Sequence, residues 1–169
     1  MKTKRLTHMS LLIAYSLVLY IIESYIPNPL IALFPGAKLG LTNIITLVSL
    51  SLLGFKDTLI IITIRVILSS MFAGPLTALL FSISGAYLSL LGMSLCLKIK
   101  SFSVVGISVV GAVCHNIGQL IVASLIIESG LIFTYLPYML IASVPTGIFV
   151  GIVSKFTLNN LSKIQQKVY

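Results

Sequence analysis

The feature that most constrains the fold of this chain is a series of long apolar runs, separated by short polar or proline- and glycine-containing breaks. A run of about 20 apolar residues forms a helix that crosses the roughly 30 Å hydrocarbon core of a bilayer. Membrane β-strands would instead alternate polar and apolar residues, whereas these runs are continuous. Because the chain is also 58% hydrophobic and only 8% charged, the pattern predicts an all-α integral membrane protein.

The breaks divide the chain into six predicted helices within a single domain, residues 1–169. Each helix is long enough to cross a bilayer at roughly 1.5 Å per residue, although the second and third only just. A signal peptide is the alternative for the first run. That run continues well beyond a typical signal h-region and no A-x-A-like site follows it, so we predict a retained helix. The predicted ranges are 7–26, 38–54, 57–73, 76–97, 102–127 and 131–156.

The loop charges predict the orientation of the bundle. If six helices alternate across the membrane, nine of the cations that flank them fall on one side. The opposite loops carry no Lys or Arg beyond Lys38. The positive-inside rule therefore predicts a multi-pass cell-membrane protein with both termini in the cytoplasm. A net charge of +8 could also suggest nucleic acid, but these cations flank apolar runs, as topology determinants do, so we expect no nucleic-acid partner. The nine cations are Lys2, Lys4, Arg5, Lys56, Lys98, Lys100, Lys155, Lys163 and Lys167.

Arg65 stands in the middle of the third predicted helix, in an otherwise apolar run. An unpaired Arg at mid-bilayer costs roughly 2.5–3.5 kcal/mol on insertion scales, so such a cation normally faces the protein interior and has a partner. The three carboxylates of the chain, Glu23, Asp57 and Glu128, fall near predicted helix ends. We therefore expect no carboxylate at the level of Arg65, and its partner to be either polar helix residues or an anionic ligand.

Further polar residues lie at a similar predicted depth. His115, Asn116 and Gln119 reach the middle of the fifth helix, and the two amides share a face because they are three residues apart. Either they line a polar pocket with Arg65, or they hydrogen-bond to Arg65 and nearby backbone. Lys38 and Asn43 could line the outer mouth of the same cavity, although Lys38 could equally pair with Glu23 or reach the headgroups. The candidate ligand-binding residues are Lys38, Asn43, Arg65, His115, Asn116 and Gln119.

Motifs for metal binding and for catalysis are missing from the sequence. Cys96 and Cys114 lie in different apolar runs without metal-ligand spacing, and we interpret His115 as a core histidine rather than a ligand. Prenyl-diphosphate chemistry needs clustered aspartates to hold Mg²⁺, and this chain has one Asp. No nucleotide-binding glycine loop is present either. We expect neither a metal nor a cofactor, and we do not expect an enzyme.

Small residues at four-residue spacing predict faces on which helices approach closely. One such face holds Ser143, Gly147 and Gly151 on the sixth helix, and another holds Ser10 and Ala14 on the first. The simpler interpretation of both is packing within the bundle.

Four segments resemble the Gx transporter family, which is also labelled heptaprenyl diphosphate synthase component I. Together they extend over most of the chain, and the first and last are the most specific. They are Pro35–Asn43 (PGAKLGLTN), Leu53–Lys56 (LGFK), Arg65 and Gly111–Gln119 (GAVCHNIGQ).

The resemblance implies a fold and a function. The family looks like the substrate-binding S components of energy-coupling-factor transporters, with six helices, both termini inside and a ligand pocket near the outer face. It implies a bacterial uptake component for a small molecule, working with a transmembrane coupling subunit and ATPases. Lys38 and Arg65 favour an anionic ligand, and their apolar surroundings favour one with a hydrophobic part. S components dock through an alanine-x-x-x-alanine pattern on helix one, which matches Ala14 and Val18 here, or Ser10 and Ala14 one turn earlier. The alternative function is a non-catalytic membrane subunit that recruits a soluble prenyl diphosphate synthase and handles its lipid product.

Overall fold

The computed structural model describes residues 2–26, 40–73 and 76–168, and these residues are helical apart from short turns. An α-helix occupies each of the six predicted apolar segments, and a short 3-10 helix follows α6. No strand occurs in the described ranges, so the all-α prediction is confirmed for them. The helices are α1 (Lys2–Tyr25), α3 (Asn43–Leu53), α4 (Phe55–Ala73), α5 (Leu76–Leu97), α6 (Val104–Ile127), η1 (Gly130–Tyr135) and α7 (Leu136–Val168).

Two boundaries differ from the prediction. The second helix begins at Asn43 rather than at residue 38, because residues 40–42 form a turn. The last helix continues to Val168, well past residue 156. Beyond the apolar run, α7 continues through a polar segment that contains Lys and Gln, two residues with high helix propensity.

Among the residues that the structure describes, four stretches are long and apolar enough to cross a membrane. At 11 residues α3 is apolar but short, and α4 carries three charges, at Lys56, Asp57 and Arg65. The structure thus supports a membrane-embedded protein, whereas the count of six spans and the orientation stay predictions. The four stretches are Thr3–Tyr25, Leu79–Leu97, Val104–Ile127 and Gly130–Leu161.

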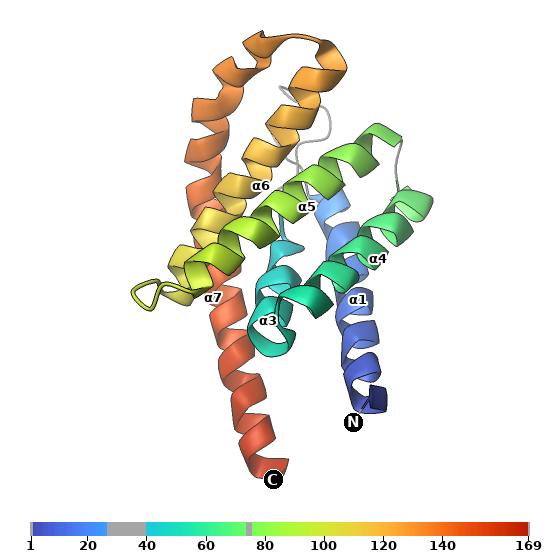
Figure 1. Cartoon of the computed structure of the whole chain (residues 1–169), viewed down its shortest axis with the longest axis vertical. Coiled ribbons are helices and arrows are strands. Elements are labelled where there is room, and N and C mark those ends of the chain that lie inside the picture. Colours follow the sequence, from blue (N-terminus) through green and yellow to red (C-terminus); the bar gives the residue numbers. More distant parts are fainter. Residues whose placement is uncertain (1, 27–39, 74–75, 169) are drawn as a thin grey trace.

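The helices form two groups, which meet through α3 and through a direct contact between α4 and α5 (Figure 1). The antiparallel helices α5, α6 and α7 pack in sequence on one side, while α1 and α4 lie next to each other on the other. The first turn of α1 and the last turn of α7 point toward the same end of the molecule. At that end Arg5 of α1 holds Asp57 of α4, with its Nε donating to Oδ2 at 2.7 Å and its Nη2 donating to Oδ1.

Glycines set the closest approaches between helices. A Cβ built on Gly147 of α7 would lie 2.7 Å from Val109 Cα of α6, and one on Gly151 would lie 2.7 Å from Val105 Cα. The prediction that Ser143, Gly147 and Gly151 form a packing face within the bundle is therefore confirmed for the two glycines. A different requirement applies at Gly54, whose φ of 82° allows one residue to join α3 to α4.

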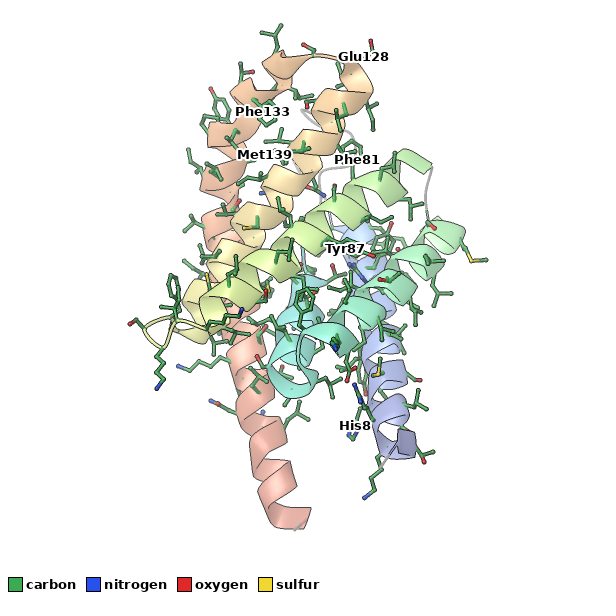
Figure 2. The ribbon with its side chains drawn as sticks, in the orientation of Figure 1. His8, Phe81, Tyr87, Glu128, Phe133 and Met139 are labelled. Atoms are coloured by element: carbon green, nitrogen blue, oxygen red, sulfur yellow. The ribbon has the colours of Figure 1, made fainter. Side chains whose placement is uncertain are left out.

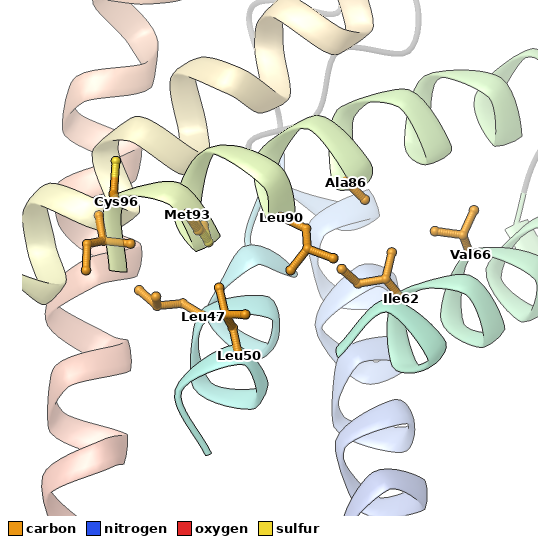
Figure 3. Packing of buried hydrophobic residues seen from close by; sticks show 9 residues of the cluster. Leu47, Leu50, Ile62, Val66, Ala86, Leu90, Met93 and Cys96 are labelled. Carbon is orange, nitrogen blue, oxygen red and sulfur yellow. The ribbon is translucent and has the colours of Figure 1, made fainter. Parts of the chain in front are cut away.

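The main apolar core lies where α3, α4 and α5 meet (Figure 3). Leu47 of α3, Ile62 and Val66 of α4, and Leu90 and Met93 of α5 are each at most 1% exposed. Near this core the Thr63 hydroxyl of α4 hydrogen-bonds the Tyr87 hydroxyl of α5 at 2.9 Å, and Figure 2 shows Tyr87 directed toward α4. The core therefore fixes α4, and with it Arg65, against α5.

Candidate ligand-binding site

Arg65 is buried near the middle of α4, with 3% of its surface exposed. It interacts electrostatically with Glu23 and Tyr20, both in the second half of α1. The Tyr20 side chain also interacts with Ser69, which lies one turn beyond Arg65 on the same face of α4. We call Tyr20, Glu23, Arg65 and Ser69 the Arg65 cluster.

The sequence placed all three carboxylates away from Arg65, but the charge of Glu23 acts on Arg65 in the structure. Glu23 does lie in the last turn of α1, as predicted, but it is 7% exposed and interacts with the Arg65 charge. Counting residues along a helix locates Cα atoms, whereas Arg carries its charge at the end of a long flexible stem. The positive charge of Arg65 is thus partly compensated by a carboxylate on a neighbouring helix.

Asn43 adjoins the Arg65 cluster through Gly40. The Gly40 backbone N–H donates to Glu23 Oε1 at 2.6 Å, and the Gly40 carbonyl accepts from the Asn43 backbone N–H at 2.9 Å. Asn43 begins α3 and is 2% exposed, yet its side-chain Oδ1 has no hydrogen-bond partner in the described ranges. An unpaired buried acceptor costs about 1–3 kcal/mol, so this amide is well suited to accept a hydrogen bond from a ligand. Lys38, predicted beside it, lies outside the described residues.

His115 packs against a glycine on the neighbouring helix. It is 4% exposed, and a Cβ built on Gly85 of α5 would lie 2.9 Å from its Cε1. Any larger residue at position 85 would displace the imidazole. These contacts are what a core histidine makes in the helix interface.

Asn116 connects α6 to α7. Its Nδ2 donates to the Met139 carbonyl at 3.1 Å and to Ser143 Oγ at 2.7 Å. Met139 lies in the upper part of α7 in Figure 2, toward the end of the molecule that holds Glu128 and away from the end that holds His8. For Asn116, bonding to nearby helix groups is therefore confirmed, and no hydrogen bond connects it to Arg65 in the structure described.

Gln119 is in the opposite situation, although it lies only three residues from Asn116. It is 0% exposed, and neither its Nε2 nor its Oε1 has a hydrogen-bond partner within the described ranges. Its neighbour Gly118 brings α6 against the backbone of Ser84, where a built Cβ would lie 2.6 Å from the carbonyl oxygen. A buried amide with an unused donor and an unused acceptor is suited to a ligand group that offers the complementary pair.

The contrast between the two amides gives a prediction about stability. Asn116→Leu should lower the free energy of unfolding by about 1–3 kcal/mol, because Ser143 and the Met139 carbonyl lose a buried partner. Gln119→Leu has a similar volume and breaks no described hydrogen bond, so it should be neutral or stabilising. Thermal unfolding of both variants in one detergent checks this. An equal drop for Gln119→Leu would show that its amide is a structural partner.

Sequence reasoning missed most of the residues around Arg65. Tyr20 and Ser69 carry no motif, and Gly40 lies in the Pro35–Asn43 segment but was not predicted as a site residue. Glu23 had a usable signal, because it is the one carboxylate of α1 and the cations of that helix are all near its other end. The three predicted docking residues, Ser10, Ala14 and Val18, are all exposed on α1.

In the ranges that the structure describes, no group of three or more His, Cys, Asp or Glu residues comes together as a metal site.

A family model described as heptaprenyl diphosphate synthase component I matches residues 12–157. The match extends from the first half of α1 to the second half of α7. Neither the curated proteins nor the solved structures give a significant match.

Proposed function

The chain belongs to the heptaprenyl diphosphate synthase component I family, and from that premise we propose that it is a non-catalytic membrane subunit working beside a soluble prenyl diphosphate synthase. The observation that carries the proposal is the family match, which takes in nearly every described helix. In this role the chain recruits the synthase to the membrane and handles its amphipathic product.

The distribution of carboxylates supports a division of labour between the two subunits. Diphosphate chemistry needs several carboxylates to hold Mg²⁺ at one place. Here Asp57 is held by Arg5, Glu23 accepts from the Gly40 backbone, and Glu128 follows the end of α6 in a left-handed conformation. The three carboxylates therefore do not gather as a metal site in the described part of the chain, and we assign the metal-dependent chemistry to the soluble partner.

Within the bundle, the proposed ligand site combines the Arg65 cluster with other buried polar groups of the described helices. Arg65 favours an anionic ligand, and the apolar helices around it favour one with a hydrophobic part. Asn43 and Gln119 contribute buried amide atoms without described partners. The proposed ligand-binding residues are Lys38, Asn43, Arg65, His115 and Gln119, while Asn116 is assigned to the α6–α7 contact.

The proposed topology has six spans and both termini in the cytoplasm, following the positive-inside rule. The first turn of α1 and the last turn of α7 lie toward one end of the molecule, which is compatible with this arrangement (Figure 1). Reporter fusions after Lys100 and after Tyr169 should both report a cytoplasmic location. An external C-terminus would contradict it.

A second candidate function is the substrate-binding component of an uptake transporter. The exposure of Ser10, Ala14 and Val18 along α1 favours it, because small exposed residues allow a partner helix to approach closely. In this case the partners are a transmembrane coupling subunit and ATPases rather than a synthase.

Copurification separates the two candidates. The tagged full chain, extracted gently from its native membrane after crosslinking, is expected to recover a soluble prenyl diphosphate synthase. Recovery of ATPase and coupling subunits instead would contradict the proposal and support the transporter. In that outcome Ala14→Leu should reduce recovery of the coupling subunit without unfolding the chain, and Lys155→Leu, at an exposed position on α7, is the control.

A further inference from the structure

A groove of about 450 Å³ lies between the C-terminal half of α5 and the corner where α3 meets α4. Leu50 of α3 forms part of its floor and lies beneath α5 in Figure 3. Phe55 of α4 lines another part of it, and Leu91, Ser94, Leu95 and Leu97 come from α5. This groove is separate from the Arg65 cluster, with which it shares no residue.

The walls of the groove are apolar, and its α5 end carries a cation. Leu91 and Leu95 are 48% and 61% exposed, so the bundle itself leaves these side chains uncovered. Lys98 is the last lining residue along α5, directly after the helix ends at Leu97. The groove therefore offers an apolar channel with a positive charge at one end.

Two further cations flank the groove in the sequence. Lys56 follows Phe55, Lys100 lies two residues beyond Lys98, and both are exposed. Asp57, the carboxylate nearest to them along the chain, is already held by Arg5. The three lysines at this end therefore have no free carboxylate close to them in the described sequence. Their combined positive charge favours a ligand whose head group carries more than one negative charge.

We propose that this groove binds an isoprenoid diphosphate, with the prenyl chain along Leu91 and Leu95 and the diphosphate at Lys98. The proposal rests on the proposed function, because it assigns to this chain a place for the product of the soluble synthase. Lys56, Lys98 and Lys100 all belong to the predicted cytoplasmic set, so the cationic end faces the compartment in which a soluble synthase works. The excess of positive charge favours a diphosphate over a phospholipid, whose phosphate carries a single charge.

The test uses the full-length chain in nanodiscs of zwitterionic lipid, with farnesyl diphosphate as the probe and native mass spectrometry as the readout. Farnesyl diphosphate should bind more tightly than farnesol, since only the former has the diphosphate. Lys98→Gln should weaken binding of farnesyl diphosphate about fivefold, the value expected for loss of one lysine near a charged head group. Leu91→Trp, which fills the groove, should weaken the binding of both probes.

Lys155→Gln is the matched control, because Lys155 is also an exposed lysine but lies on α7, outside the groove. It should leave the affinity unchanged. Equal binding of farnesol and farnesyl diphosphate, no effect of Lys98→Gln, or equal competition by phosphatidylglycerol would each overturn the proposal and leave a groove filled by bulk lipid. The assay contains no synthase, so its failure is distinct from a failure to copurify the synthase.

Discussion

Arg65→Met is expected to destabilise the protein, and adding Glu23→Gln in the same chain should recover much of that loss. Both residues are buried, at 3% and 7% exposure, and their charges interact across α1 and α4. Removing only the cation leaves a buried carboxylate with less compensation, which is the costly way to break a buried pair. The coupling energy between the two sites should be roughly 0.5–3 kcal/mol.

The measurement is a double-mutant cycle of thermal unfolding in one detergent, comparing wild type, both single variants and the double variant. Lys155→Met is the control for loss of a cation, because Lys155 is exposed and should change the melting temperature little. Strict additivity of the two substitutions would show that Glu23 and Arg65 are not coupled. The folded double variant then tests the ligand role of Arg65, since loss of a bound small molecule there cannot be attributed to unfolding.

Gly147→Ala and Gly151→Ala should each destabilise the protein by about 1–3 kcal/mol, the usual cost of overpacking. A Cβ at either position would lie 2.7 Å from a backbone Cα of α6, at Val109 or Val105. A backbone atom cannot rotate away as the end of a flexible side chain can, so α6 and α7 must separate along this line.

Gly130→Ala is the matched control for the two glycine substitutions. A Cβ built on Gly130 meets no atom within 4 Å, and the residue begins the short η1 helix at the surface. The melting temperature of the Gly130→Ala variant should therefore stay close to that of the wild type. Wild-type stability of both Gly147→Ala and Gly151→Ala would mean that the α6–α7 contact is looser than the structure indicates.

The helices were predictable from the sequence because the hydrocarbon core of a bilayer demands long apolar runs, and such runs are visible without any tertiary information. The packing role of Gly147 and Gly151 was also predictable, since four-residue spacing places them on one face. The boundaries were harder to predict. The turn at residues 40–42 is apolar at Leu41, and α7 continues into a polar tail, so neither boundary coincides with a change in hydropathy.

The candidate site was predictable in its residue types but not in its pairings. Arg65, Asn43 and Gln119 were identified because polar groups in apolar runs are costly and so have a reason to be there. Which groups they meet depends on how each helix is rotated and tilted, and on where a long side chain extends. Asn116 turned out to bond α7 rather than Arg65, and Glu23 turned out to interact with Arg65 across two helices.

The short α3 and the charged α4 also determine how the chain can enter a membrane during synthesis. At 11 residues, α3 rises only about 16 Å, roughly half the hydrocarbon thickness. The three charges of α4 make it unfavourable for this helix to leave the translocon alone and enter the lipid. The neighbouring helices α1 and α5 are long and apolar enough to insert independently. We therefore expect α3 and α4 to remain at the translocon until α5 emerges, and to enter the bilayer already in contact with α1 and α5.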